Sequence, residues 1–171
     1  MLIYYVFMAS TELVDIVDKE NNVVGVADVD TAHNEKLMHR VAGVFVFDPD
    51  GCLYLQTGNK YGKLDLSVGG HVQKGESYEQ AAQREMQEEI GLVVPIAHVS
   101  TFLPKEARMN HYWAIFTATT PAGWVFKETD EVKSLEKMSL EKIKQMMQSD
   151  RDLFTHGFMN TMEEFIRLKN I

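Results

Sequence analysis

The sequence predicts an α/β fold, in which a mixed β-sheet carries helices on its faces, within a single domain spanning residues 1–171. Short runs rich in Val, Ile, Phe and Tyr recur between turn residues and predict strands. One long amphipathic helix interrupts these runs, and two more helical segments follow near the C-terminus. A chain of 171 residues with 45% hydrophobic content and no Pro/Gly/Ser-rich linker is typical of one compact core.

The first predicted element is a β-hairpin over about residues 11–30. Its strands are expected at residues 13–17 and 23–29, with Asn21-Asn22 as the turn between them. The apolar run at residues 2–8 lacks a basic segment and a good cleavage site, and it is too short to span a bilayer. We interpret this run as an edge strand or as a leader upstream of a true start at Met8.

The later elements follow from apolar runs, turns and caps. Residues 41–47 predict a buried strand that turns back through Asp48-Pro49-Asp50-Gly51 into a strand at residues 52–56. Ser139 is expected to cap a helix ending near residue 148. The remaining elements are strands at residues 96–102, 112–119 and 132–136, and a last helix from about Gly157 through Arg167.

The helix predicted over residues 78–90 has clear signals at both ends. Ser77 and Gln80 form a capping box at its N-terminus, and Gly91 stands where a left-handed C-terminal cap would fall. Ala82, Met86 and Ile90 recur every four residues and form the apolar stripe. This stripe is expected to pack against the sheet.

The face beside that stripe collects the acids Glu85, Glu88 and Glu89. Like charges at these spacings repel by roughly 0.2–0.5 kcal/mol per pair, and acids in the last turns also oppose the helix dipole. Only Arg84 offsets this charge within the helix. The face is therefore either an ordinary solvated acidic surface or a cation site.

The segment before the helix favours a cation site. Gly69, Gly70 and Gly75 bracket a short loop that ends in Glu76, so flexible backbone and a further carboxylate lie beside the acidic face. Magnesium or manganese, held by carboxylates and by the phosphate oxygens of a substrate, is the natural occupant of such a site. The expected cofactor is therefore Mg²⁺ or Mn²⁺.

Residues 70–92 resemble the Nudix box, and nine fixed positions at fixed spacing make the resemblance specific. Met86 is a mild variant of the usual branched aliphatic residue. The resemblance implies an α/β/α sandwich and a pyrophosphohydrolase that cleaves a nucleoside diphosphate derivative, or a related small organic diphosphate, by water attack. The matching positions are Gly70, Glu76, Arg84, Glu85, Met86, Glu88, Glu89, Gly91 and Leu92.

The same resemblance implies roles for the box residues. Glu85 and Glu89 would bind the metal, Glu88 would join them directly or through water, and the carbonyl of Gly69 or Gly70 would complete the shell. Glu76 would accept a hydrogen bond from Arg84, which is also what a purely structural salt bridge would look like. The general base stays open between Glu88 and the later acids Glu128, Asp130 and Glu131, of which Glu131 is preferred.

Beyond the box, the layout resembles the Nudix subgroup that includes isopentenyl-diphosphate isomerase. That enzyme has Ser-Val-Cys-Gly-His before its box, with a catalytic cysteine, whereas this chain has Ser67, Val68, Gly69, Gly70 and His71. Gly69 therefore disfavours an isomerase and favours hydrolysis. A catalytically silent Nudix-fold binding module is a third hypothesis, although such modules commonly lose box acids.

Three histidines are candidate metal ligands by the same comparison. The isomerase binds a metal through two histidines before the core strand and one after the cysteine; His71 matches the last position, and His33 and His39 approximate the other two. The acidic ligands that follow in the isomerase have no clear counterpart, since residues 109–113 read Met-Asn-His-Tyr-Trp. Exposed or hydrogen-bonding histidines are the alternative interpretation.

Charge and composition limit the partners. A formal charge of −8 argues against a dedicated nucleic-acid binder, and a small-molecule diphosphate is the expected partner. The single Cys52 suits a reducing cytoplasm, no membrane association is expected, and the methionines at helical spacing are core residues or a homodimer contact. Candidate phosphate-binding bases and stacking aromatics are Lys60, Lys63, Lys105, Arg108, Tyr61, Tyr112, Trp113 and Trp124.

Overall fold

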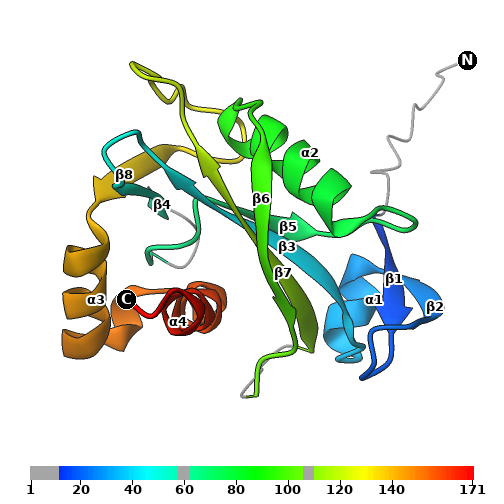
Figure 1. Ribbon diagram of the computed structural model, residues 1–171. Helices are drawn as coiled ribbons and strands as arrows, with labels where there is room; N and C mark the ends of the chain where they lie inside the picture. The colour runs from blue at the N-terminus through cyan, green and yellow to red at the C-terminus, as the bar shows by residue number, and fades with distance from the viewer. Residues whose placement is uncertain (1–11, 58–61, 106–109) are drawn as a thin grey trace, which may run out of the picture.

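The computed structural model describes residues 12–57, 62–105 and 110–171 of the chain. Within this part, eight strands form one sheet with helices on both of its faces (Figure 1). This is the α/β fold that the sequence predicts. The apolar run at residues 2–8 and the candidate side chains of Lys60, Tyr61 and Arg108 lie outside the described residues.

The strands and helices alternate irregularly along the chain. The strands are β1 (Leu13–Val17), β2 (Val23–Asp28), β3 (His39–Phe47), β4 (Leu53–Thr57), β5 (Val68–His71), β6 (Ile96–Phe102), β7 (His111–Thr119) and β8 (Ser134–Met138). The helices are α1 (Val29–Asn34), α2 (Tyr78–Ile90), α3 (Leu140–Ser149) and α4 (His156–Lys169), with a short 3-10 turn η1 (Arg151–Leu153).

Strand β3 organises the sheet. It pairs in parallel with β7 along its whole length and antiparallel with β5 over four residues. The β1–β2 hairpin joins one end of β3 through the pair Ile16 and His39, and β4 joins the other end through the pair Phe47 and Leu53. Strands β6 and β8 extend the sheet by pairing with β7 and β4.

The two faces of the sheet bury separate hydrophobic cores. Successive residues of a strand point to opposite faces, so Val41 and Phe45 of β3 pack with α3 and α4, while Ala42, Val44 and Val46 pack with α2. Figure 1 shows α2 on one side of the sheet and α3 and α4 on the other. The result is the α/β/α sandwich that the Nudix resemblance implies.

Most predicted elements are confirmed, with local corrections. The helix at residues 78–90, the hairpin and the strand at residues 96–102 are present as expected. Residue 29 does not end a strand but begins α1, because Asp28 caps this short helix by accepting a hydrogen bond from the Thr31 amide. Gly69 and Gly70 belong to β5 rather than to a loop, and the last strand lies at 134–138 instead of 132–136.

The structure shows the burial of several side chains whose environment the sequence did not determine. Trp113 is buried between β7 and α4, and Met147, Met159 and Met162 are buried in the same core, while a homodimer stays a prediction. Cys52 is a free, half-buried thiol just before β4.

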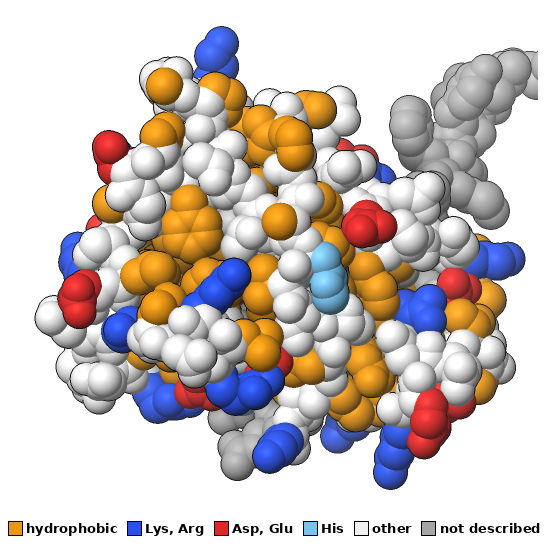
Figure 2. Space-filling model, in the orientation of Figure 1, with side chains coloured by type: hydrophobic (Ala, Val, Ile, Leu, Met, Phe, Trp, Pro, Cys, Tyr) orange, Lys and Arg blue, Asp and Glu red, His pale blue; other side chains and the backbone are white. Residues whose placement is uncertain are grey.

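Figure 2 shows partly exposed hydrophobic side chains over the middle of one face and charged side chains of both signs mostly around its margin. In the described part of the chain, no helix is long and apolar enough to cross a membrane.

Candidate metal-dependent active site

Helix α2 presents two of its acids to the sheet. Ser77 and Gln80 form the capping box, and Gly91 adopts the left-handed cap with φ of 65°. Because Ala82, Met86 and Ile90 are buried, the neighbouring positions 85 and 89 also face inward. Glu85 and Glu89 are accordingly only 7% and 9% exposed.

Glu89 is held by two neutral donors. Its Oε2 accepts hydrogen bonds from the amide of Gly69 and from Nε2 of Gln56, both at 3.0 Å. These bonds favour the charged carboxylate, but burial outweighs them and raises the pKa of Glu89 to about 8. Burial also raises the pKa of Glu85. Burial therefore disfavours the charged form of both carboxylates, and a bound cation would restore it.

Arg84 joins the helix to the loop before it. Its Nε and Nη2 lie 2.9 and 3.0 Å from the two carboxylate oxygens of Glu76, and Nη2 also donates to the carbonyl of His71 at 3.0 Å. Its Nη1 donates to Glu85 at 2.7 Å and to Glu88 at 3.0 Å. The guanidinium lowers the pKa of Glu76. Arg84 thus fixes three carboxylates and one strand end.

A third acid reaches the helix from the loop between β7 and β8. Carboxylate oxygens of Glu85, Glu89 and Glu131 lie within 4.8 Å of one another. Thr129 anchors this loop, because its hydroxyl donates to the Glu89 carbonyl at 2.7 Å and accepts from the Val132 amide at 3.0 Å. Three converging carboxylates are hard oxygen donors and fit Mg²⁺ or Mn²⁺.

Glu88 has a different environment from the other two box acids. Its side chain is 49% exposed, it accepts a hydrogen bond from Arg84, and it lies outside the cluster of Glu85, Glu89 and Glu131. It lines an open pocket of about 580 Å³ together with Glu131, and the candidate bases Glu128 and Asp130 line that pocket as well. All four candidates for the general base therefore line the same pocket, and Glu131 also belongs to the converging acids.

A second open pocket, of about 500 Å³, is also lined by Glu88 and Glu131. It adds two charged residues that the sequence interpretation did not include, Glu12 and Lys74. Burial raises the pKa of Glu12. Nothing in the neighbouring sequence marks either residue as part of a site, since Glu12 precedes β1 and Lys74 occupies a variable position of the box. The acids in this pocket outnumber Lys74 and Arg84, so the site is electronegative without a cation.

The candidate substrate-binding side chains are mostly elsewhere. Trp113 is buried, and Trp124 packs against Tyr54 at 5.3 Å between ring centroids. Lys63 lies 3.9 Å from Asp152, and Lys105 is exposed. Neither pocket is lined by these residues or by Tyr112. Lys74 is the lysine that lines the pocket beside Arg84.

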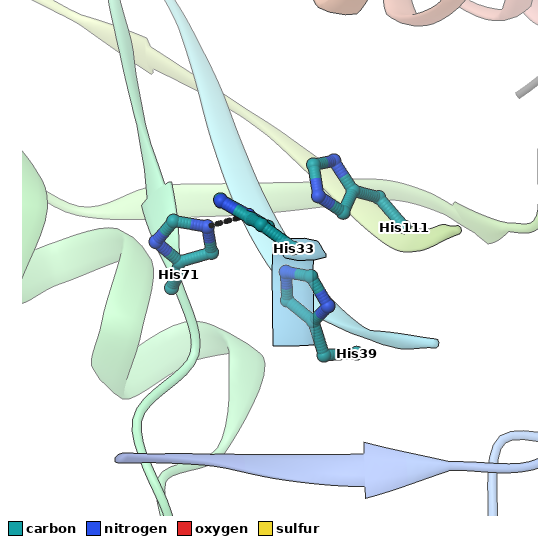
Figure 3. Close-up of side chains that lie close together, drawn as sticks. All are labelled: His33, His39, His71 and His111. Atoms are coloured by element: carbon teal, nitrogen blue, oxygen red, sulfur yellow. Dashed lines mark hydrogen bonds between the residues drawn. The ribbon is translucent and has the colours of Figure 1, made fainter. Parts of the chain in front are cut away.

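The three candidate histidines lie together, and a fourth joins them (Figure 3). His33, His39, His71 and His111 each offer a ring nitrogen, and these nitrogens lie within 4.8 Å of one another. Burial lowers the pKa of His39, that of His71 to about 4 and that of His111 to about 3. His111 was not among the predicted ligands, because the isomerase has acidic ligands in this part of its chain.

Comparison with known proteins places this geometry in a family. A family model described as NUDIX domain matches residues 37–157. An uncharacterized Nudix hydrolase of Yersinia pestis is 34% identical over 132 residues, 72% of this chain and 72% of that protein. An isopentenyl-diphosphate Delta-isomerase 2 of Photorhabdus laumondii is 31% identical over 157 residues, 86% of this chain and 88% of that protein.

Solved structures agree on the fold. A crystal structure from Deinococcus radiodurans matches with a TM-score of 0.68 and 25% identity, covering 81% of this chain and 90% of that one. A MutT protein from Methanosarcina mazei matches with a TM-score of 0.60 and 22% identity, covering 77% of this chain and 92% of that one.

Proposed function

Because the chain belongs to the Nudix hydrolase family, we propose that it cleaves a diphosphate linkage in a nucleoside diphosphate derivative or related small organic diphosphate by water attack. The observation that carries this proposal is the convergence of Glu85, Glu89 and Glu131 beside an open pocket. A diphosphate resists hydrolysis because its oxygens repel nucleophiles, so an enzyme must neutralise charge and position a water.

The converging carboxylates supply the first requirement. Glu85, Glu89 and Glu131 would hold Mg²⁺ or Mn²⁺, which when bound neutralises phosphate charge and lowers the pKa of a coordinated water. Glu76 and Arg84 are positioning residues, because their paired hydrogen bonds hold the loop against α2. The amide of Gly69 orients Glu89 by donating a hydrogen bond to its Oε2. The carbonyl of Gly69 remains a candidate metal ligand.

The second requirement is a residue that positions and deprotonates the attacking water, and we assign this role to Glu88. Glu88 lines both pockets, is half exposed and stands outside the three converging acids. Glu131 lines both pockets too, but it belongs to the converging set and is therefore assigned to the metal. Lys74 would meet a phosphate oxygen, since it lines the first pocket and is exposed.

A substrate panel tests the proposal. Nucleotide sugars, dinucleotides, oxidised nucleotides and prenyl diphosphates would be incubated with Mg²⁺ and then with excess chelator. We expect metal-dependent product release, with one oxygen from ¹⁸O-labelled water in a phosphate product. Glu89→Gln should abolish turnover, whereas Glu79→Gln, an exposed acid of the same helix, should leave it unchanged. Turnover that survives Glu89→Gln would contradict the site assignment.

An isomerase acting on isopentenyl diphosphate is the second candidate, because one relative at 31% identity carries that name. Gly69 stands where the isomerase has its catalytic cysteine, and the single cysteine of this chain, Cys52, lies before β4. The same panel separates the two functions. Conversion of isopentenyl diphosphate without phosphate release would support the isomerase, and hydrolysis of any panel member would support the pyrophosphohydrolase.

A further inference from the structure

We propose that His33, His39, His71 and His111 form a second metal site, which binds one zinc-like transition cation through four ring nitrogens and ties together the ends of three strands and α1 (Figure 3). The six distances between ring centroids run from 4.6 to 6.1 Å, so the rings form one compact group. The argument for this site does not rest on the proposed hydrolase activity.

The sheet register brings three of the histidines to one face. His39 and His111 are direct partners in the parallel β3–β7 pairing, and His71 is the partner of Val41 on β5. Paired residues, and residues two apart on a strand, share a face of the sheet. The fourth ring, His33, comes from α1, which begins after the Asp28 cap and contacts β1 and β2. Long-range pairing thus builds the cluster.

The buried nitrogens of this cluster lack protein partners. Nε2 of His39 and Nε2 of His111 are buried and have no hydrogen-bond partner among the described residues. His39 Nδ1 lies 2.9 Å from the Leu37 carbonyl, which can only accept, so Nδ1 carries the hydrogen and Nε2 offers a lone pair. A buried polar atom without a partner is destabilising, and a cation would satisfy both nitrogens at once.

The remaining pair already has nearly the spacing of metal ligands. Nε2 of His33 and Nε2 of His71 lie 3.1 Å apart. A tetrahedral Zn²⁺ with bonds of about 2.0–2.1 Å places its nitrogens roughly 3.3 Å from one another. Since all four nitrogens lie within 4.8 Å, at most about 1.5 Å of closure between any two would complete such a shell.

The donor atoms distinguish this site from the acidic one. Imidazole nitrogens suit Zn²⁺ and similar transition cations, whereas Mg²⁺ prefers oxygen. Four protein ligands close the shell, which is typical of a structural zinc. Glu12 Oε2 lies 3.8 Å from His71 Nδ1, where a carboxylate can orient a ligating ring.

The two sites also lie on opposite faces of the sheet. Gly70 faces Glu85 of α2, because a Cβ there would overlap the carboxylate, and the next residue, His71, points the other way. The His71 carbonyl accepts from Arg84, so a cation on the His71 ring would fix the strand end that Arg84 contacts. The structural cation would therefore stabilise the backbone on which the acidic site is built.

The test uses the metal-free full-length protein with Zn²⁺ and Co²⁺ alone. Competition with a chromophoric chelator should show one tight Zn²⁺ per chain, and Co²⁺ should give the intense visible bands of tetrahedral coordination. Zn²⁺ should raise the melting temperature by several degrees. His111→Ala and His33→Ala should weaken Zn²⁺ binding at least 100-fold. Glu89→Gln, and His98→Ala at an exposed histidine of β6, should leave it unchanged.

Three results would overturn the proposal: no tight Zn²⁺ in the unaltered protein, equal affinity in the His111→Ala variant, or loss of binding in Glu89→Gln. Circular dichroism identifies a histidine variant that fails to fold. In that case X-ray absorption of the unaltered zinc protein decides, since four imidazoles at about 2.0 Å support the site and an oxygen shell excludes it.

Discussion

Gly70 lies directly against the carboxyl group of Glu85, so closely that a Cβ atom at position 70 would overlap it. The absence of a side chain on β5 is therefore what lets α2 bring Glu85 to the sheet. Since Gly70 has no left-handed backbone angle, its role is space and not conformation. This relationship gives a physical reason for a glycine at the first position of the box.

The Gly70→Ala variant should displace Glu85 and lower metal-dependent activity by at least 100-fold. Overpacking of this kind costs about 1–3 kcal/mol of unfolding free energy, so the variant should still fold. Urea unfolding and Mg²⁺ titration of activity measure the two effects. Gly25→Ala is the matched control, because a Cβ on Gly25 would make ordinary contact with Ile16 at 3.8 Å. Full activity in Gly70→Ala would contradict the assigned role of Glu85.

The contribution of Glu89 to the stability of the metal-free protein should fall as pH rises from about 4.5 to 8. An unfolded glutamate ionises near 4.5, whereas burial keeps the folded Glu89 protonated up to a pKa of about 8. Glu89 in the folded state then keeps a proton that it has lost in the unfolded state, so its contribution to stability falls with rising pH, by a few kcal/mol at most. Mg²⁺ competes with that proton, so Mg²⁺ affinity should rise over the same window. The buried histidines, whose pKa values are lowered, contribute to stability in the opposite direction below about pH 6.5.

The Glu89→Gln variant isolates this effect. Without the ionisable group, the melting temperature of the metal-free variant should rise relative to that of the unaltered protein between pH 4.5 and 8, and it should be the higher of the two at pH 8. Both proteins should keep a further dependence on pH, because burial raises the pKa of Glu85 and lowers the pKa values of the clustered histidines. Thermal unfolding in chelator across this pH range makes the comparison. Parallel curves for the two proteins would show that Glu89 is not the titrating group.

The Arg84→Lys variant should lose both stability and activity although the charge is kept. Lysine cannot form the paired bonds to Glu76 together with those to Glu85 and the His71 carbonyl. We expect a loss of about 2–4 kcal/mol in unfolding free energy and at least a tenfold fall in kcat. Arg167→Lys is the control, because the Arg167 side chain is 66% exposed; it should change stability by less than about 0.5 kcal/mol.

The sequence was sufficient to predict an element whose boundaries are set by residues within that element. The capping box at Ser77 and the glycine at position 91 set the ends of α2, and both act within one helical turn. Spacing then placed Glu85 and Glu89 on one face. The box could therefore be predicted together with the helix that carries it.

Long-range pairing explains what the sequence could not reveal. Gly69 and Gly70 resemble a loop locally, but the backbone hydrogen bonds of β3 make them a strand. His111 and Gln56 have no signal near them, since the first meets the other histidines through the β3–β7 register and the second reaches Glu89 from β4. Contacts between distant segments decide which side chains meet.

The Gln56→Leu variant tests one such contact. Gln56 Nε2 donates to Glu89 Oε2 at 3.0 Å and to the Ser67 carbonyl at 3.2 Å, so leucine removes both bonds while keeping a similar volume. Loss of a residue that orients a metal ligand typically weakens metal binding 10–100-fold. We therefore expect a matching rise in the Mg²⁺ concentration needed for half-maximal activity, with kcat retained at saturating Mg²⁺. Gln83→Leu, at an exposed position of α2, is the control. A fall in kcat that excess Mg²⁺ does not restore would instead place Gln56 against the substrate.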